Sequence, residues 1–260
     1  MILALGENGF QSGEGRSQTD INLSGVQEVL LKRVMAVNEN VVLVLMNGRP
    51  LTIPWAAENV PSIVEAWHLG SEAGNAIADV LFGDYNPSGK LPISFPRHVG
   101  QVPIYYNHKN TGRPVAPVSN MVFWSHYTDE SNLPLYPFGY GLSYTNFEYG
   151  ELSVSSPTMK MNESVDVSIT LTNSGKVGGS EVVQFYIRDL VASVSRPVKE
   201  LKGFEKIFLE AGESRQVTFS VDKETLKFYA KNSWVTEPGE FTLFVGGNSV
   251  DVLETTLVVE

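Results

Sequence analysis

The sequence predicts two domains of different fold class, an α/β domain followed by an all-β domain. Up to about residue 95, segments with apolar residues at helical spacing alternate with short continuous apolar runs. This alternation is typical of a mostly parallel sheet with flanking helices. From about residue 152, short segments alternate apolar and polar residues, which is the period of half-buried strands. A chain of 260 residues has room for two ordinary domains.

The chain opens on an apolar run, Met1 to Gly6, which predicts a buried strand that runs into a loop at the glycine. The run lacks the charged leader and the small-residue cleavage site of a signal peptide. Because a buried strand that opens at the first residue is typical of a truncated domain, we expect the chain to be a fragment. Its native start and any targeting signal would then lie outside it.

Two helices are expected in the first domain. Residues 26–36 place apolar side chains at helical spacing, with Asp20 or Ser24 as the candidate N-cap. Residues 74–82 form a second, shorter helical pattern, and Gly83 follows it as a stop signal. Helices at these two positions would cover the faces of the sheet.

Two strands are expected between and beside those helices. Residues 41–46 form a continuous apolar run rich in β-branched side chains, as in a strand that is buried on both faces of a parallel sheet. Residues 62–68 predict another strand, ended by Gly70. Residues 1–120 are assigned to this α/β domain, and residues 121–150 to an ordered connection rich in proline, glycine and tyrosine.

Residues 151–260 are expected to form a β-sandwich of the immunoglobulin-like or fibronectin-like kind, because several short strands with regular turn signals follow one another. The expected strands include 165–171, 182–187, 217–221, 239–245 and 253–258. Their inward side chains predict a core that includes Val167, Ile169, Val183, Phe185, Phe219, Phe241 and Leu243. The basic residues Arg196, Lys199, Lys202 and Lys206 are expected on a solvated strand face.

The composition excludes several classes of function. With 19 basic and 29 acidic residues the net charge is −10, so neither a nucleic acid nor an anionic membrane surface is the expected partner. The chain has no cysteine, which excludes disulfides, thiolate metal sites and a cysteine nucleophile. No apolar run approaches the 18 residues that suggest a membrane span. A hydrophobic content of 42% supports a folded core.

No segment has the residue spacing of a phosphate-binding loop, a metal site or a serine-nucleophile motif. Gly83 to Lys90 has five residues between its glycines, a proline inside, and Leu91 where a phosphate loop needs serine or threonine. The four histidines, His68, His98, His108 and His126, form no helical pair and have no carboxylate at ligand spacing. There is no Gly-x-Ser-x-Gly elbow. The sequence therefore indicates no cofactor and no metal.

The loop from Gly6 to Arg16 is the best candidate for a reactive site. It follows the carboxyl end of the first expected strand, where ligands gather in open α/β sheets. Glu14 has a glycine on each side, so the backbone presents its carboxyl group with little steric cover. On composition alone, a solvated surface loop with incidental acids remains an alternative.

Longer motifs resemble those of glycoside hydrolase family 3, in particular its bacterial periplasmic β-glucosidases. They are SGEG at 12–15, LMNGRPL at 45–51, GNAIADVLFGDYNPSGKLP at 74–92, YPFGYGLSYT at 136–145 and SRPVKELKGFEK at 195–206. The resemblance implies a three-part enzyme with an N-terminal barrel, an α/β sandwich and a fibronectin type III-like domain. This chain would be the later part of the sandwich and the complete third domain, and the barrel would be missing.

The resemblance also implies the chemistry, which is retaining, exo-acting hydrolysis of terminal β-D-glucosyl residues. A retaining glycosidase uses a nucleophile and an acid/base about 5–5.5 Å apart. The SGEG match gives the acid/base role to Glu14, with Glu7 of the same loop as the runner-up. The missing barrel would supply the aspartate nucleophile, so the chain alone is expected to be inactive. The parent is expected to be periplasmic or secreted.

Three aromatic or imidazole side chains are further candidates for substrate binding. Trp124, His126 and His108 lie within residues 96–145, a stretch without a sustained period that reads as a long connection, where such side chains can line sugar subsites or pin the connection onto neighbouring domains. Two other readings of the whole chain stay open. The first is a non-catalytic carbohydrate-binding or scaffolding module, and the second is a β-xylosidase or N-acetylglucosaminidase parent. The expected partners are a β-linked glucoside or oligosaccharide and the missing barrel.

Overall fold

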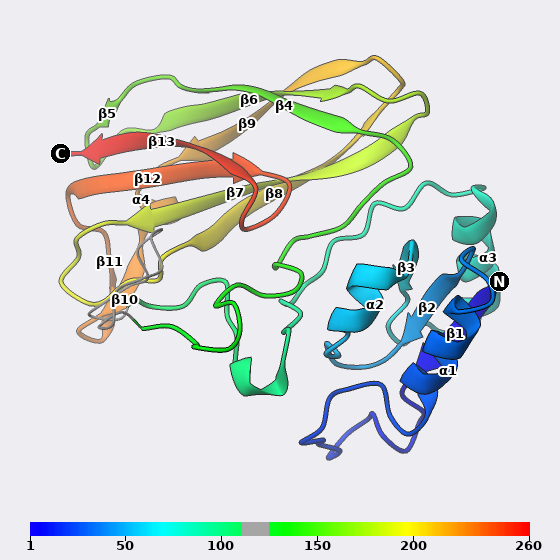
Figure 1. Ribbon diagram of the computed structural model, residues 1–260. Coiled ribbons are helices and arrows are strands. Elements are labelled where there is room, and N and C mark those ends of the chain that lie inside the picture. The colour runs from blue at the N-terminus through cyan, green and yellow to red at the C-terminus, as the bar shows by residue number, and fades with distance from the viewer. Residues whose placement is uncertain (111–124) are drawn as a thin grey trace. The chain divides into compact units, whose positions relative to one another are not determined.

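The computed structural model describes residues 1–110 and 125–260, and these form two compact units (Figure 1). Unit 1 comprises Met1–Tyr85, Ile93–Ile104 and Tyr127–Tyr136. Unit 2 comprises Asn86–Pro92, Tyr105–His126 and Pro137–Glu260. The chain therefore passes between the units several times. The domain boundaries expected at residues 120 and 150 stay a prediction.

Unit 1 is a parallel sheet with helices, as the sequence predicts (Figure 1). Its elements are β1 (Ile2–Gly6), α1 (Gln27–Met35), β2 (Val42–Met46), α2 (Pro54–Asn59), β3 (Ser62–Glu65), α3 (Ala73–Phe82) and the 3-10 helix η1 (Val99–Gln101). The strand order is β1-β2-β3, and the three strands are parallel. In the central strand, Leu43, Val44 and Leu45 are all buried, which confirms a strand covered on both faces.

The start of α1 corrects the expected N-cap. Neither Asp20 nor Ser24 caps the helix, whose N-cap is Val26 with no side-chain hydrogen bond. Asp20 instead accepts from Asn22, and the Ser24 hydroxyl accepts from Gln27. The physical reason is a turn at Gly25, which has a φ of +63° and separates Ser24 from the first helical turn.

The other elements of unit 1 differ in length from the expectation. Helix α2 was not predicted, because six residues are too few to show a period, although Pro54 at its first turn is a recognised start signal. Strand β3 ends at Glu65, since Trp67 takes a φ of +50° and turns the chain away from the sheet. Helix α3 ends at Gly83, with a φ of +85°, as predicted.

Unit 2 contains two antiparallel sheets and a short hairpin. Its elements are β4 (Phe147–Val154), β5 (Thr158–Met159), β6 (Val165–Asn173), β7 (Gly179–Asp189), β8 (Glu200–Leu209), β9 (Ser214–Val221), α4 (Lys223–Leu226), β10 (Phe228–Ala230), β11 (Ser233–Val235), β12 (Gly239–Gly246) and β13 (Val252–Val259). The strand orders are β5-β13-β12-β7-β8, β4-β6-β9 and β10-β11. All pairs are antiparallel except β5 with β13. The all-β part of the predicted fold class is therefore confirmed.

The core of unit 2 lies between the two larger sheets and contains six of the seven predicted residues, whereas Phe219 is partly buried and packs against it. On β6, alternate residues from Val165 to Leu171 are buried, as expected of a strand with one solvated face. The rings of Phe185 and Phe219 stack across the core with centroids 5.2 Å apart. Each fully buried aliphatic or aromatic side chain contributes about 1.5–3 kcal/mol, so this cluster dominates the stability of the unit.

The segment Asn86–Pro92 is a structural part of unit 2. The ammonium group of Lys90 lies 2.9 Å from the carboxylate of Glu181 and donates to the carbonyl oxygen of Gly141 at 2.8 Å. The Tyr149 hydroxyl donates to the same carboxylate at 3.0 Å. Only 12% of the Lys90 side chain and 7% of the Glu181 side chain are exposed. The segment that superficially resembles a phosphate loop is thus held by a buried ion pair.

The expected solvated face of basic residues is wrong for Arg196, only 5% of whose side chain is exposed. Its guanidinium contacts Asp189 at 3.5 Å, pairs with Glu200 and lies 4.2 Å from the ring centre of Phe228. Lys199 is also partly enclosed, because it donates to the carbonyl oxygen of Ser249 at 2.7 Å. Burial lowers the pKa of Lys199 to about 8. Sequence spacing alone could not reveal this, since Asp189, Phe228 and Ser249 are brought to these side chains by tertiary packing.

We expect Lys90→Met to destabilise unit 2 by about 3–5 kcal/mol, because it leaves the Glu181 carboxylate buried and without its cation. Urea denaturation followed by circular dichroism would measure the loss. The control is Lys160→Met, since Lys160 and Glu163 form an exposed pair 3.6 Å apart that should contribute at most about 1 kcal/mol. Equal effects of the two substitutions would contradict the structural role of Lys90.

Candidate functional site

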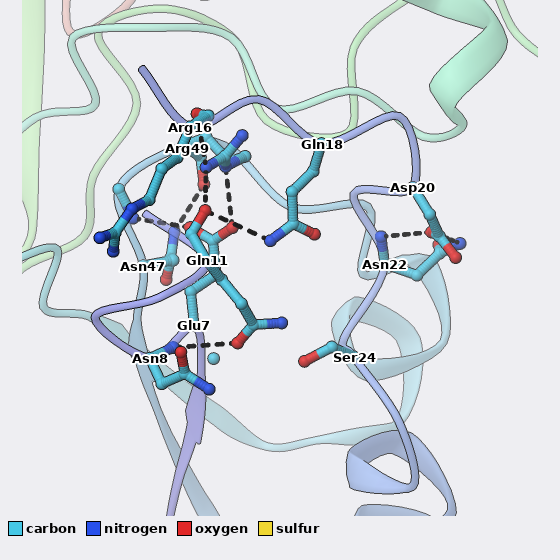
Figure 2. A network of polar contacts seen from close by, with 12 residues as sticks. Glu7, Asn8, Gln11, Arg16, Gln18, Asp20, Asn22, Ser24, Asn47 and Arg49 are labelled. Atoms are coloured by element: carbon cyan, nitrogen blue, oxygen red, sulfur yellow. Dashed lines mark hydrogen bonds and ion pairs between the residues drawn. The ribbon is translucent and has the colours of Figure 1, made fainter. Parts of the chain in front are cut away.

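The candidate site is formed by the loops that follow β1, β2 and β3. The carboxyl ends of parallel strands lie at one edge of a sheet, so these loops meet there although they are far apart in the sequence. The backbone N–H of Glu7, directly after β1, donates to the carbonyl oxygen of Met46 at the end of β2, at 2.8 Å. Figure 2 shows the polar network around this edge.

Glu14 is exposed in the first of these loops. In the described part of the chain its side chain has no hydrogen-bond or ion-pair partner, so the carboxyl group is open to a ligand. The flanking Gly13 and Gly15 have φ values of +141° and +69°. Residues with a side chain rarely adopt these conformations, so the backbone on both sides of Glu14 depends on glycine.

Glu7, the runner-up for the same role, lies in a different environment. Its side chain is 5% exposed, and one carboxylate oxygen lies 2.8 Å from Nε of Arg49. The other oxygen accepts the backbone N–H of Gly48 at 3.1 Å. Figure 2 shows Glu7 beneath Arg49 within the network. The geometry therefore gives Glu7 the features of a structural anion.

Arg49 connects the β2 loop to the β1 loop. One terminal nitrogen of its guanidinium donates to the carbonyl oxygen of Gln11 at 2.6 Å and lies 3.5 Å from that of Arg16 (Figure 2). A side chain at Gly48 would not fit, because its Cβ would lie 2.0 Å from Oγ of Ser12. The two loops are thus in contact at Gly48 and through the side chain of Arg49.

A second polar cluster lies at the ends of β2 and β3. Asn47 is fully buried and donates to the carbonyl oxygen of Arg49 at 2.8 Å and to the carboxylate of Glu65 at 3.3 Å. The backbone N–H of Trp67 donates to the same carboxylate at 2.9 Å. Burial raises the pKa of Glu65 to about 7, and the two donated hydrogen bonds oppose this rise. Glu65 therefore keeps its proton to a higher pH than an exposed glutamate does.

Sequence reasoning did not assign a role to Asn47, Arg49 or Glu65. The first two belong to a motif that the family resemblance singles out, and they follow a buried strand at the carboxyl edge of the sheet. Their position after the strand could have indicated a role in the site, because ligands bind at this edge of open α/β sheets. The burial of Glu65 could not be predicted, because it depends on the turn at Trp67.

Of the three predicted substrate-binding residues, His108 and His126 belong to unit 2, whereas Glu14 belongs to unit 1. Trp124 lies outside the described residues. His126 and His108 are both exposed. Nδ1 of His108 lies 3.1 Å from the carbonyl oxygen of Lys109, and the backbone oxygen of His108 accepts from Val198 at 2.9 Å. Their role in substrate binding stays a prediction.

Among the described residues, no three or more histidine or acidic side chains gather as a metal site would require. None of the helices in that part of the chain combines the length and apolar character of a bilayer span. The contacts at the sheet edge bring together carboxyl, amide and guanidinium groups. Such a set suits proton transfer and hydrogen bonding to hydroxyl-rich ligands.

Comparison with protein families gives two matches. Residues 1–144 match the model of the glycosyl hydrolase family 3 C-terminal domain, and this is more than half of the chain. Residues 181–249 match a fibronectin type III-like domain. The first match contains every loop of the candidate site, and the second lies within the sandwich of unit 2.

Comparison with individual proteins gives long matches. The chain is 50% identical over 253 residues to a periplasmic β-glucosidase of Salmonella typhimurium, a match that covers 97% of this chain and 33% of that protein. It is 44% identical over 257 residues to a β-xylosidase of Formosa agariphila, covering 98% and 35%. A crystal structure of a Listeria innocua β-glucosidase in complex with glucose is 45% identical, with a TM-score of 0.95, and the match covers 99% of this chain and 36% of that one. The chain thus spans about a third of the length of these relatives.

We expect unit 1 to lose stability as the pH rises from 4.5 to 7. The pKa of Glu65 is raised in the folded protein, so the folded state binds the proton more tightly than the unfolded state over this range. The shift corresponds to at most about 3 kcal/mol. Glu65→Gln stays neutral and should lack this part of the loss, as measured by hydrogen exchange of the β2 amides at pH 5 and pH 8. Glu28→Gln, on the exposed face of α1, is the control, and identical pH dependence in all three proteins would contradict the prediction.

Proposed function

The chain belongs to glycoside hydrolase family 3, and we propose that it is the C-terminal part of a retaining, exo-acting β-glucosidase in which Glu14 is the general acid/base. The observation that carries the assignment is the contrast between two carboxylates of one loop. Glu14 is exposed between two glycines, whereas Glu7 is buried against Arg49. A group that must give a proton to a substrate and later take one from water has to be accessible.

The chemistry assigned to Glu14 has two steps. In the first, its carboxyl group donates a proton to the glycosidic oxygen while a nucleophile attacks the anomeric carbon, and the aglycone leaves. In the second, the Glu14 carboxylate removes a proton from water, which displaces the enzyme nucleophile and releases the sugar with retained configuration. The nucleophile would come from a part of the full-length protein outside this chain, about 5–5.5 Å from Glu14.

The sugar that is released is proposed to be β-D-glucose. Support comes from the relatives named as β-glucosidases, of which the Listeria innocua protein has been crystallised with glucose and, as a D270A mutant, with laminaribiose. A β-xylosidase is the second candidate, because the relative from Formosa agariphila is 44% identical over 257 residues. By the same reasoning from the Salmonella relative, the full-length protein is proposed to be periplasmic or secreted.

We expect the chain alone to hydrolyse no aryl β-glucoside at a detectable rate, because it carries the proposed acid/base and no partner nucleophile. The measurement is release of 4-nitrophenol from its β-glucoside, with the full-length protein as the positive control. Turnover by the chain that disappears in Glu14→Gln would overturn the proposal, since a second catalytic carboxylate would then have to lie within these 260 residues.

In the full-length protein, we expect Glu14→Ala to slow the hydrolysis of glucosides with poor leaving groups by about 10²–10⁴-fold. Activated aryl glucosides should lose far less in the first step, because their leaving groups need no proton. Azide should restore turnover and yield the β-glucosyl azide, because it attacks the glycosyl–enzyme without base assistance. Measurement of kcat/KM over a leaving-group series, with product analysis, tests both signatures.

The matched control for that series is Glu28→Ala, which removes an exposed carboxylate from α1. It should leave the leaving-group dependence unchanged and give no azide product. If Glu14→Ala behaves like Glu28→Ala, the acid/base is another residue.

A further inference from the structure

The side chain of Arg49 holds the Glu14 loop on both sides of Glu14. Its terminal nitrogen donates to the carbonyl oxygen of Gln11 at 2.6 Å, three residues before Glu14, and lies 3.5 Å from that of Arg16, two residues after it. Both contacts are to the backbone, so they depend on the path of the loop and not on its side chains. Figure 2 shows Arg49 beside Gln11 and Arg16.

We propose that Arg49 is a positioning residue for Glu14, and that the buried carboxylate of Glu7 holds Arg49 in place for this purpose. The inference rests on the proposed function, since it assumes that Glu14 is the general acid/base. Arg49 itself is not expected to contact the bond that is cleaved. It acts by fixing the backbone from which Glu14 extends.

The need for such a residue follows from the glycines. Gly13 and Gly15 allow the backbone conformation that exposes Glu14, yet they also give the loop conformational freedom that other residues would restrict. No hydrogen bond or ion pair to the described residues holds the Glu14 side chain. A misplacement of about 1 Å can slow a catalysed step by about 10²-fold. Anchors on both sides of the flexible segment reduce that error.

The choice of arginine also follows from the geometry. Nε lies 2.8 Å from the Glu7 carboxylate while a terminal nitrogen reaches the Gln11 carbonyl, so the two ends of one planar group serve two partners. Lysine has a single ammonium group and cannot reproduce that fork. Lysine does keep the positive charge beside Glu7, whose side chain is 5% exposed, so the substitution avoids an unpaired buried charge.

A further contact supports the same role. Gly48, next to Arg49, donates its backbone N–H to the Glu7 carboxylate at 3.1 Å. A Cβ at Gly48 would lie 2.0 Å from Oγ of Ser12, which shows how closely the β2 loop packs against the β1 loop two residues before Glu14. The β2 loop therefore supports the Glu14 loop through the guanidinium of Arg49 and through the close packing of Gly48 against the Ser12 side chain.

The test uses Arg49→Lys in the full-length protein and the same series of aryl and alkyl β-glucosides. We expect kcat/KM for poor leaving groups to fall by about 10–10²-fold and that for activated leaving groups to change little, with partial recovery by azide. Arg215→Lys is the matched control, because Arg215 is an exposed arginine that pairs with Glu213 in the sandwich. It should leave all these values unchanged.

The decisive measurement is a double-mutant cycle with Glu14→Ala. If Arg49 acts through Glu14, adding Arg49→Lys to Glu14→Ala should cause no further loss with poor leaving groups. An equal loss for all leaving groups, or effects that multiply in the double variant, would overturn the positioning role and leave the role of Glu14 intact. If Glu14→Ala itself shows no leaving-group dependence, the proposed function fails and this inference fails with it.

A second variant keeps the test decisive if Arg49→Lys does not fold. Glu7→Gln preserves the shape of the Glu7 side chain and removes the charge that holds Arg49, which is 21% exposed and can remain hydrated. We expect Glu7→Gln to lower kcat/KM for poor leaving groups as Arg49→Lys does, but by a smaller factor. Added to Glu14→Ala, it should cause no further loss. A Glu7→Gln protein that folds and shows full activity with poor leaving groups would contradict the part assigned to Glu7.

Discussion

Parallel pairing of β1, β2 and β3 is the constraint on which the site depends. It brings three loops from distant parts of the sequence to one edge of the sheet, and the contacts between those loops follow from it. Glu7 and Arg49 could not form an ion pair if β1 and β2 were not neighbours that run in the same direction. The position of Glu14 also depends on this pairing, because Arg49 of the β2 loop donates a hydrogen bond to the carbonyl oxygen of Gln11 in the loop that carries Glu14.

The three carboxyl groups at this edge of the sheet differ in burial and in their partners. The side chain of Glu7 is buried beside the Arg49 cation and accepts one backbone N–H, Glu65 is partly buried and accepts two hydrogen bonds, and Glu14 is exposed. The same chemical group thus serves as a structural anion, a group whose pKa is raised to about 7, and an accessible acid. Sequence distance does not separate these roles, since Glu7 and Glu14 share one loop.

The sequence predicts more of the fold than of the candidate site. Period and turn signals are local, so the alternation on β6, the buried run of β2 and the glycine stop after α3 were visible in the sequence. The N-cap of α1 was wrong because Gly25 inserts a turn. The role of Arg49 and the burial of Arg196 depend on partners that tertiary packing brings in, and no periodicity encodes those partners. The assignment of Glu14 stays a prediction, and it rests on the flanking glycines and the motif, which are local features.

The placement of Lys90 has a consequence for how such proteins can be recombined. Residues 86–92 lie between two segments of unit 1 in the sequence, yet they belong to unit 2, where Lys90 neutralises the buried Glu181. A gene fusion that transferred only the continuous sandwich, from Pro137 to Glu260, would leave behind the cation that this carboxylate requires. The two units are thus separate as folded bodies but interleaved as genetic segments, and a junction chosen at a single point in the chain cannot exchange one without damaging the other.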